Sequence, residues 1–85
     1  MHRLTFENEA FDEFTEWATH DKKLFIRIVK LLAEIRRTPF DGTGKPEALK
    51  HDYKGCWSRR IDQEHRLIYK VTDETILVLS CRDHY

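Results

Sequence analysis

The spacing of apolar residues changes once along the chain, and this change limits the folds that the chain can adopt. Between about residues 8 and 38 the apolar residues recur every three or four positions, as on one side of an α-helix. From residue 57 to residue 82, β-branched and aromatic residues instead form three short runs separated by polar turns. Helices followed by antiparallel strands predict an α+β fold.

Two amphipathic helices are expected in the first half of the chain. The first spans residues 8 to about 19, with acids in its first turns, where the helix dipole favours negative charge. Asp21 can cap a second helix that ends at about Thr38, because a residue before proline disfavours the helical conformation. The pair forms a helical hairpin. The apolar stripes are Ala10, Phe11, Phe14, Trp17 and Ala18, then Leu24, Phe25, Ile28, Leu31, Leu32 and Ile35.

Shorter elements complete the predicted fold. Residues 2–6 alternate between apolar and polar side chains and suit a brief N-terminal strand, and Pro46 can begin a short helix that ends before Gly55. Strands at 57–62, 65–72 and 75–82 are expected to pair as an antiparallel meander, which packs against the helical hairpin. No internal repeat or linker marks a second domain, so we expect one domain over residues 1–85.

The composition suits a small protein with one core. The 85 residues are 40% apolar and 35% charged, which favours a folded chain with a polar surface. No apolar run approaches the roughly 18 to 20 residues that a membrane span needs, and the first residues lack a signal peptide's apolar stretch, so we expect a cytoplasmic protein with no membrane contact. Cys56 and Cys81 are then expected to be buried thiols. No CxxC or HxxxH spacing suggests a metal site, and no cofactor is expected.

Basic residues are concentrated in the middle of the chain. Residues 1–21 carry one base and six acids, residues 22–60 carry eleven and four, and residues 61–85 carry three and five, which gives net charges of −5, +7 and −2. A basic patch that binds a polyanion can therefore form despite the zero total, although a solvated helix face explains the same stripe. On the second helix the basic residues are Lys22, Lys23, Arg27, Lys30, Arg36 and Arg37.

Alternation along the three strands divides their side chains between two faces. The residues expected to face the helices are Trp57 and Ile61, then Leu67, Tyr69 and Val71, then Leu77, Leu79 and Cys81. The residues expected to face away are Ser58, Arg60 and Asp62, then Arg66, Ile68 and Lys70, then Ser80, Arg82 and His84.

Three basic side chains therefore share the face of the sheet away from the helices, namely Arg60, Arg66 and His84. Together with a loop that bears Glu47 and Lys50, this face is chemically suited to a phosphodiester. Ordinary surface charge on the solvated face of a two-layer fold explains the pattern equally well.

Five motifs follow one another in a distinctive order: RRTPF (36–40), GKPEALKH (44–51), GCWSRRI (55–61), EHRLIY (64–69) and CRDHY (81–85). Together they resemble the YoeB family of bacterial toxins, within the RelE/ParE superfamily. The resemblance spans nearly the whole chain and implies the RelE-like fold. Ala48 and Cys56 depart from it, at positions near these motifs where relatives tend to have a second proline or an aromatic residue.

The resemblance implies the toxin of a type II toxin-antitoxin system, an endoribonuclease that cuts mRNA on the ribosome without a metal. Glu47 would take the proton from a ribose 2′-hydroxyl, whose oxygen attacks the phosphorus, and His84 would protonate the departing 5′-oxygen to leave a 2′,3′-cyclic phosphate. Arg66 would stabilise the phosphorane, and Tyr85 would stack on a base or orient the phosphate. The implied site is catalytic Glu47, Arg66, His84 and Tyr85, with Lys50 and Arg60 as substrate-binding residues.

The resemblance also implies partners. These are a YefM-type antitoxin, the ribosome and its mRNA, and operator DNA only through the antitoxin; a homodimer stays open. The alternative is a non-catalytic, ParE-like toxin that inhibits its target through protein contacts, and the joint presence of Glu47, Arg66 and His84 favours RNA cleavage over it. Another interpretation gives the same residues ordinary structural roles. Glu47 then neutralises nearby lysines, and His84 and Tyr85 are terminal residues without a catalytic role.

Overall fold

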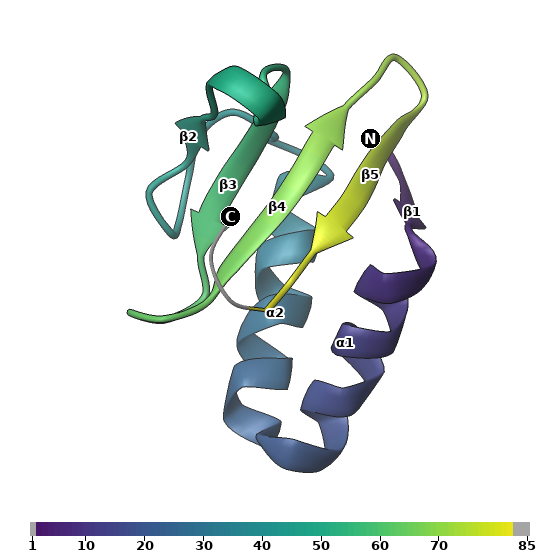
Figure 1. The fold of residues 1–85 in the computed structure, drawn as a ribbon, viewed down its shortest axis with the longest axis vertical. Helices are drawn as coiled ribbons and strands as arrows, with labels where there is room; N and C mark the ends of the chain where they lie inside the picture. The colour runs from purple at the N-terminus through teal and green to yellow at the C-terminus, as the bar shows by residue number, and fades with distance from the viewer. Residues whose placement is uncertain (1, 83–85) are drawn as a thin grey trace.

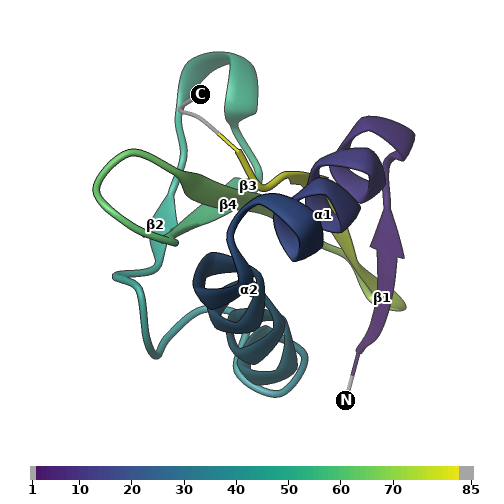
Figure 2. The same cartoon turned by 90° about the horizontal axis from the view of Figure 1, so that it is seen from below.

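Two helices cover one face of a five-stranded sheet (Figure 1). The computed structural model describes residues 2–82. Helices α1 (Asn8–His20) and α2 (Lys22–Ile35) form the predicted hairpin, seen nearly end-on in Figure 2, and both pack against the same core cluster. Asp21 caps α2 as predicted, because its Oδ1 accepts a hydrogen bond from the backbone N–H of Leu24 at 3.2 Å. The α+β prediction is confirmed.

The sheet has the order β1-β5-β4-β3-β2. Strands β3, β4 and β5 form the antiparallel meander that the sequence predicts, whereas β1 pairs with β5 in parallel. The N-terminal strand β1 therefore lies at one edge of the sheet, and β2 lies at the other edge. The strands are β1 (Arg3–Phe6), β2 (Glu47–Ala48), β3 (Cys56–Arg60), β4 (Arg66–Val71) and β5 (Thr75–Ser80).

The segment after Pro46 differs from its prediction as a short helix. Glu47 and Ala48 form β2, antiparallel to β3, and a 3-10 turn, η1 (His51–Tyr53), follows later. The cause is a reversal of the chain just before Pro46. Gly44 and Lys45 have φ angles of 86° and 52°, in the left-handed region, and the carbonyl of Gly44 accepts a 2.7 Å hydrogen bond from the N–H of Arg60. Pro46 therefore leads into an edge strand.

The core has two parts. The larger lies between the helices and the sheet, and the smaller, built from Leu49, Cys56 and Ile68 with Leu79 packed against them, lies on the other face, here called the open face. Cys56 and Cys81 are buried free thiols, as predicted. The larger part comprises Ala10, Ile28, Leu31, Leu32, Ile35, Ile61, Leu67, Tyr69, Ile76, Val78 and Cys81.

Strand β5 corrects the predicted alternation. Ile76 and Val78 pack in the larger core, so Leu77 and Leu79 do not face the helices as predicted. The pairing of β4 with β5 contains an irregularity: Tyr69 lies opposite Val78, but Ile68 lies opposite Ser80. One residue is skipped, which shifts the alternation and lets Cys81 face the core after all.

Arg82 also departs from the prediction. Its Nη1 lies 2.6 Å from Oε2 of Glu16 on α1, so it turns to that helix and not to the open face. Among the helices of residues 2–82, none is both long and apolar enough to cross a membrane.

Candidate active site

Strands β2, β3 and β4 bring Glu47 and Arg66 together on the open face. Glu47 lies opposite Ser58 of β3, while Arg66 lies opposite Arg60 at the other end of the β3–β4 pair. Oε1 of Glu47 is 3.6 Å from Nη1 of Arg66, and the same nitrogen donates a 3.2 Å hydrogen bond to Oγ of Ser58. Strand pairing thus assembles a carboxylate and a guanidinium that lie far apart in the sequence.

These side chains line an open pocket of about 250 Å³, together with Lys45, Pro46 and Arg60. The Glu47 side chain is 58% exposed and that of Arg66 is 19% exposed, so a polyanionic substrate can reach both. The three cations can bind a phosphate, and the carboxylate can accept a proton from a group beside that phosphate. Of the residues predicted on or beside this face, Glu47, Arg60 and Arg66 line one pocket.

Of the other predicted site residues, Lys50 alone lies within the described part of the chain. Lys50 is exposed and precedes η1, and it is not among the described residues that line the pocket. His84 and Tyr85 lie outside the described residues. Their predicted roles therefore remain predictions.

Comparison with known proteins decides the family. The model of the YoeB-like toxins of bacterial type II toxin-antitoxin systems matches residues 6–85. The chain belongs to this family. It is 48% identical to the toxin YoeB of Escherichia coli K12 over 83 residues, which cover 98% of this chain and 99% of that protein.

Solved structures agree with this assignment. The YoeB/ParE toxin from Agrobacterium tumefaciens superposes with a TM-score of 0.94 at 40% identity, over 98% of this chain and 99% of the other. YoeB from Staphylococcus aureus was solved as a dimer (TM-score 0.90, 42% identity, 99% and 98% covered) and in a complex with YefM (0.89, 41%, 100% and 99%). The YoeB fold therefore extends over the described chain.

Arg59 is a residue of this YoeB-family chain that the sequence analysis missed. Its side chain is fully buried, and its guanidinium donates to five oxygens. The strand pattern indicated that this residue is buried, because alternation places residue 59 on the same face as the inward-facing Trp57 and Ile61. The acceptors are Oε1 of Glu34 (2.5 Å), Oη of Tyr69 (3.2 Å) and the carbonyls of Thr38 (2.6 Å), Asp41 (2.8 Å) and Thr43 (3.2 Å).

These bonds fix the segment that leads from α2 to the pocket. The hydrogen bond from the backbone N–H of Thr43 lowers the pKa of Glu34, and Arg59 lowers it further, so the ion pair is charged at neutral pH. Gly42 is required beside it, because a Cβ there would lie 2.1 Å from Oε1 of Glu34 and the residue has a φ of +124°.

The end of β5 is held against α1. The backbone N–H of Cys81 donates to Oε1 of Glu13 at 2.9 Å, and Nε1 of Trp17 donates to the Cys81 carbonyl at 2.8 Å. Burial raises the pKa of the Cys81 thiol to about 12, so this thiol is protonated at neutral pH and is a poor nucleophile. Cys81 is therefore structural.

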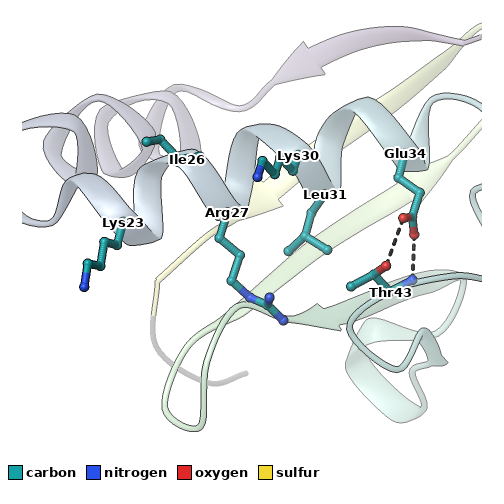
Figure 3. A pocket seen from close by; sticks show the side chains of 7 residues that line it. All are labelled: Lys23, Ile26, Arg27, Lys30, Leu31, Glu34 and Thr43. Atoms are coloured by element: carbon teal, nitrogen blue, oxygen red, sulfur yellow. Dashed lines mark hydrogen bonds between the residues drawn. The ribbon is translucent and has the colours of Figure 1, made fainter.

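The basic stripe of α2 is divided between two roles. Nε of Arg27 donates to the carbonyl of Ile61, and Nε of Arg36 donates to that of His2 at 3.2 Å. Figure 3 shows Arg27 reaching from α2 toward the strands, beside a pocket of about 360 Å³ that Lys23 and Lys30 also line. The lysines are exposed and make no contact of this kind with the described part of the chain, while Arg27 and Arg36 also stabilise the fold.

Proposed function

We propose that this chain is an endoribonuclease that cuts mRNA on the ribosome by metal-independent attack of a ribose 2′-hydroxyl. The observation that carries the proposal is the approach of Glu47 to Arg66, 3.6 Å apart in an open pocket that Lys45 and Arg60 make strongly basic. A base beside several phosphate ligands is what transfer of a phosphoryl group to a neighbouring hydroxyl requires.

Each residue then has a defined task. Glu47 removes the proton of the 2′-hydroxyl, whose oxygen attacks the adjacent phosphorus, and His84 protonates the departing 5′-oxygen. Arg66 and Arg60 stabilise the additional negative charge on the phosphorane, since a guanidinium is planar and always charged. The products are a 2′,3′-cyclic phosphate and a 5′-hydroxyl. Tyr85 orients the phosphate or stacks on a base, and Lys50 binds the RNA backbone beyond the pocket.

The ribosome supplies the orientation that a shallow pocket lacks. The pocket has a volume of only about 250 Å³, and the described residues that line it are a proline and charged residues, with no aromatic side chain among them to splay an RNA strand. Exposed lysines of α2, including Lys22, Lys23 and Lys30, would dock on ribosomal RNA. Holding the mRNA against Glu47 in this way lowers the entropic cost of cleavage.

The partner that restrains the activity would be a YefM-type antitoxin, as the complex of the S. aureus YoeB supports. An acidic antitoxin segment suits the basic pocket, and operator DNA would be bound only through the antitoxin. A homodimer is the further assembly that the S. aureus YoeB dimer supports. Since its target is the translating ribosome, the protein would act in the cytoplasm.

Primer extension on an mRNA translated in a cell-free system tests the proposal. Wild-type protein should create new 5′ ends within the open reading frame, and Glu47→Gln should abolish them. Glu74→Gln, which changes an exposed acid in the turn after β4, is the matched control and should cleave like wild type. Inhibited growth without any new 5′ end would instead favour the ParE-like alternative.

A further inference from the structure

Ser58 lies at the centre of the pocket's supporting strand and is fully buried, although it is on the open face. Its cross-strand neighbours are Glu47 on β2 and Ile68 on β4. Neighbouring side chains therefore cover it. Its hydroxyl is nevertheless placed to accept a hydrogen bond from a side chain of the pocket.

The contact that Ser58 makes is with Arg66. Nη1 of Arg66 donates to Oγ of Ser58 at 3.2 Å, while the same nitrogen is 3.6 Å from Oε1 of Glu47. A direct charge-assisted hydrogen bond between a guanidinium and a carboxylate is shorter, about 2.7 to 2.9 Å. Arg66 is thus bonded to the serine and stays just beyond hydrogen-bond distance of the glutamate.

This separation matters for catalysis. A guanidinium and a carboxylate that meet without constraint form two parallel N–H···O bonds. In such a pair the carboxylate oxygens are occupied by the arginine and the arginine's donors by the carboxylate. Neither group would then be ready to take a proton or bind a phosphate.

We propose that Ser58 is a positioning residue for the reaction, whose hydroxyl holds the Arg66 guanidinium apart from the Glu47 carboxylate. The proposal rests on the nuclease function proposed above. Because Ser58 is short and is carried by the central strand of the β2-β3-β4 group, its oxygen has a fixed position beside the Arg66 guanidinium. Arg66 is then oriented before substrate binds.

The first test measures single-turnover cleavage on programmed ribosomes by Ser58→Ala. The rate constant for cleavage should fall about ten- to a hundredfold, the cost typical of a misplaced catalytic group, with little change in the concentration that gives half-maximal rate. Thr5→Val is the control. It removes a hydroxyl that lies 2.7 Å from Oγ1 of Thr75 at the other edge of the sheet and should cleave like wild type.

The second test measures coupling with Arg66. If Ser58 acts through the arginine, Ser58→Ala should cause no further loss of rate in a protein that already carries Arg66→Ala. A Ser58→Ala loss of equal size in both backgrounds would overturn the proposal. Ser58→Thr, which keeps a hydroxyl, should retain a higher rate than Ser58→Ala.

Folding is followed by thermal denaturation of each variant. Should Ser58→Ala unfold, Ser58→Cys serves in its place, because the sulfur fills the buried position but accepts hydrogen bonds only weakly. The two proposals fail differently. No cleavage by wild-type protein contradicts the nuclease function, whereas active wild type with an equally active, folded Ser58→Ala or Ser58→Cys contradicts only the role of Ser58.

Discussion

Arg59 and Glu34 form an ion pair that joins β3 to α2. Nη1 of Arg59 lies 2.5 Å from Oε1 of Glu34, and the arginine side chain is fully buried. Because the other donors of Arg59 bind the carbonyls of Thr38, Asp41 and Thr43, the pair fixes the chain from the end of α2 to the reversal at Gly44. The position of Glu47 therefore depends on an arginine that is not itself in the pocket.

Arg59→Ala should destabilise the fold by about 3 kcal/mol, because it removes a fully buried side chain and leaves the carbonyls of Thr38, Asp41 and Thr43 without this donor. Urea denaturation followed by circular dichroism measures this loss. Arg37→Ala, in the same part of the chain but exposed, should change the free energy of unfolding by no more than about 0.5 kcal/mol. Equal urea midpoints for the two variants would show that Arg59 does not hold this segment.

Glu47→Ala, Arg66→Ala and His84→Ala should each abolish growth inhibition when the protein is produced without its antitoxin. The expected loss in cleavage rate is on the order of 10²- to 10⁴-fold for the general base or acid. Growth curves and primer extension measure the two effects, and circular dichroism checks that each variant is folded. Three folded variants that remained fully toxic would rule out the nuclease mechanism.

Reversing the charge of Lys22, Lys23 and Lys30 should weaken cleavage on the ribosome more than any residual cleavage of free RNA. Each lost phosphate contact lowers the salt dependence of binding, so the triple variant should bind ribosomes about tenfold or more weakly at ~0.1 M salt and with a shallower salt slope. Sedimentation with ribosomes at several salt concentrations measures this. Arg3→Glu on the edge strand β1 is the control; an equal effect of both changes would contradict docking through α2.

The Cys81 thiol should make stability depend on pH in the alkaline range. Its pKa is raised to about 12 in the folded protein from an ordinary value of 9.0, so the folded state keeps a proton that the unfolded state loses. The stabilisation is complete below pH 9.0 and is lost as the pH rises toward 12. Melting temperatures of wild type should therefore fall more steeply above pH 9 than those of Cys81→Ala. Parallel curves for the two proteins would contradict this burial.

Local patterns in the sequence determined most of the elements. The helical spacing of apolar residues, the Asp21 cap and Pro39 predicted the hairpin, although α2 ends at Ile35, before the predicted end at Thr38. Alternation predicted β3 and β4 and placed Arg60 and Arg66 together. These features depend on residues within a few positions of each other, which is why they can be recognised without a structure.

The tertiary structure alone decided where distant segments meet. The parallel pairing of β1 with β5, the edge strand at Glu47 and the irregularity near Leu79 each depend on hydrogen bonds between segments far apart in the sequence, which no local pattern encodes. The same holds for the site. The sequence supplied Glu47, Ser58 and Arg66 as residue types, but only the alignment of β2 and β4 on either side of β3 set their distances of 3.2 and 3.6 Å.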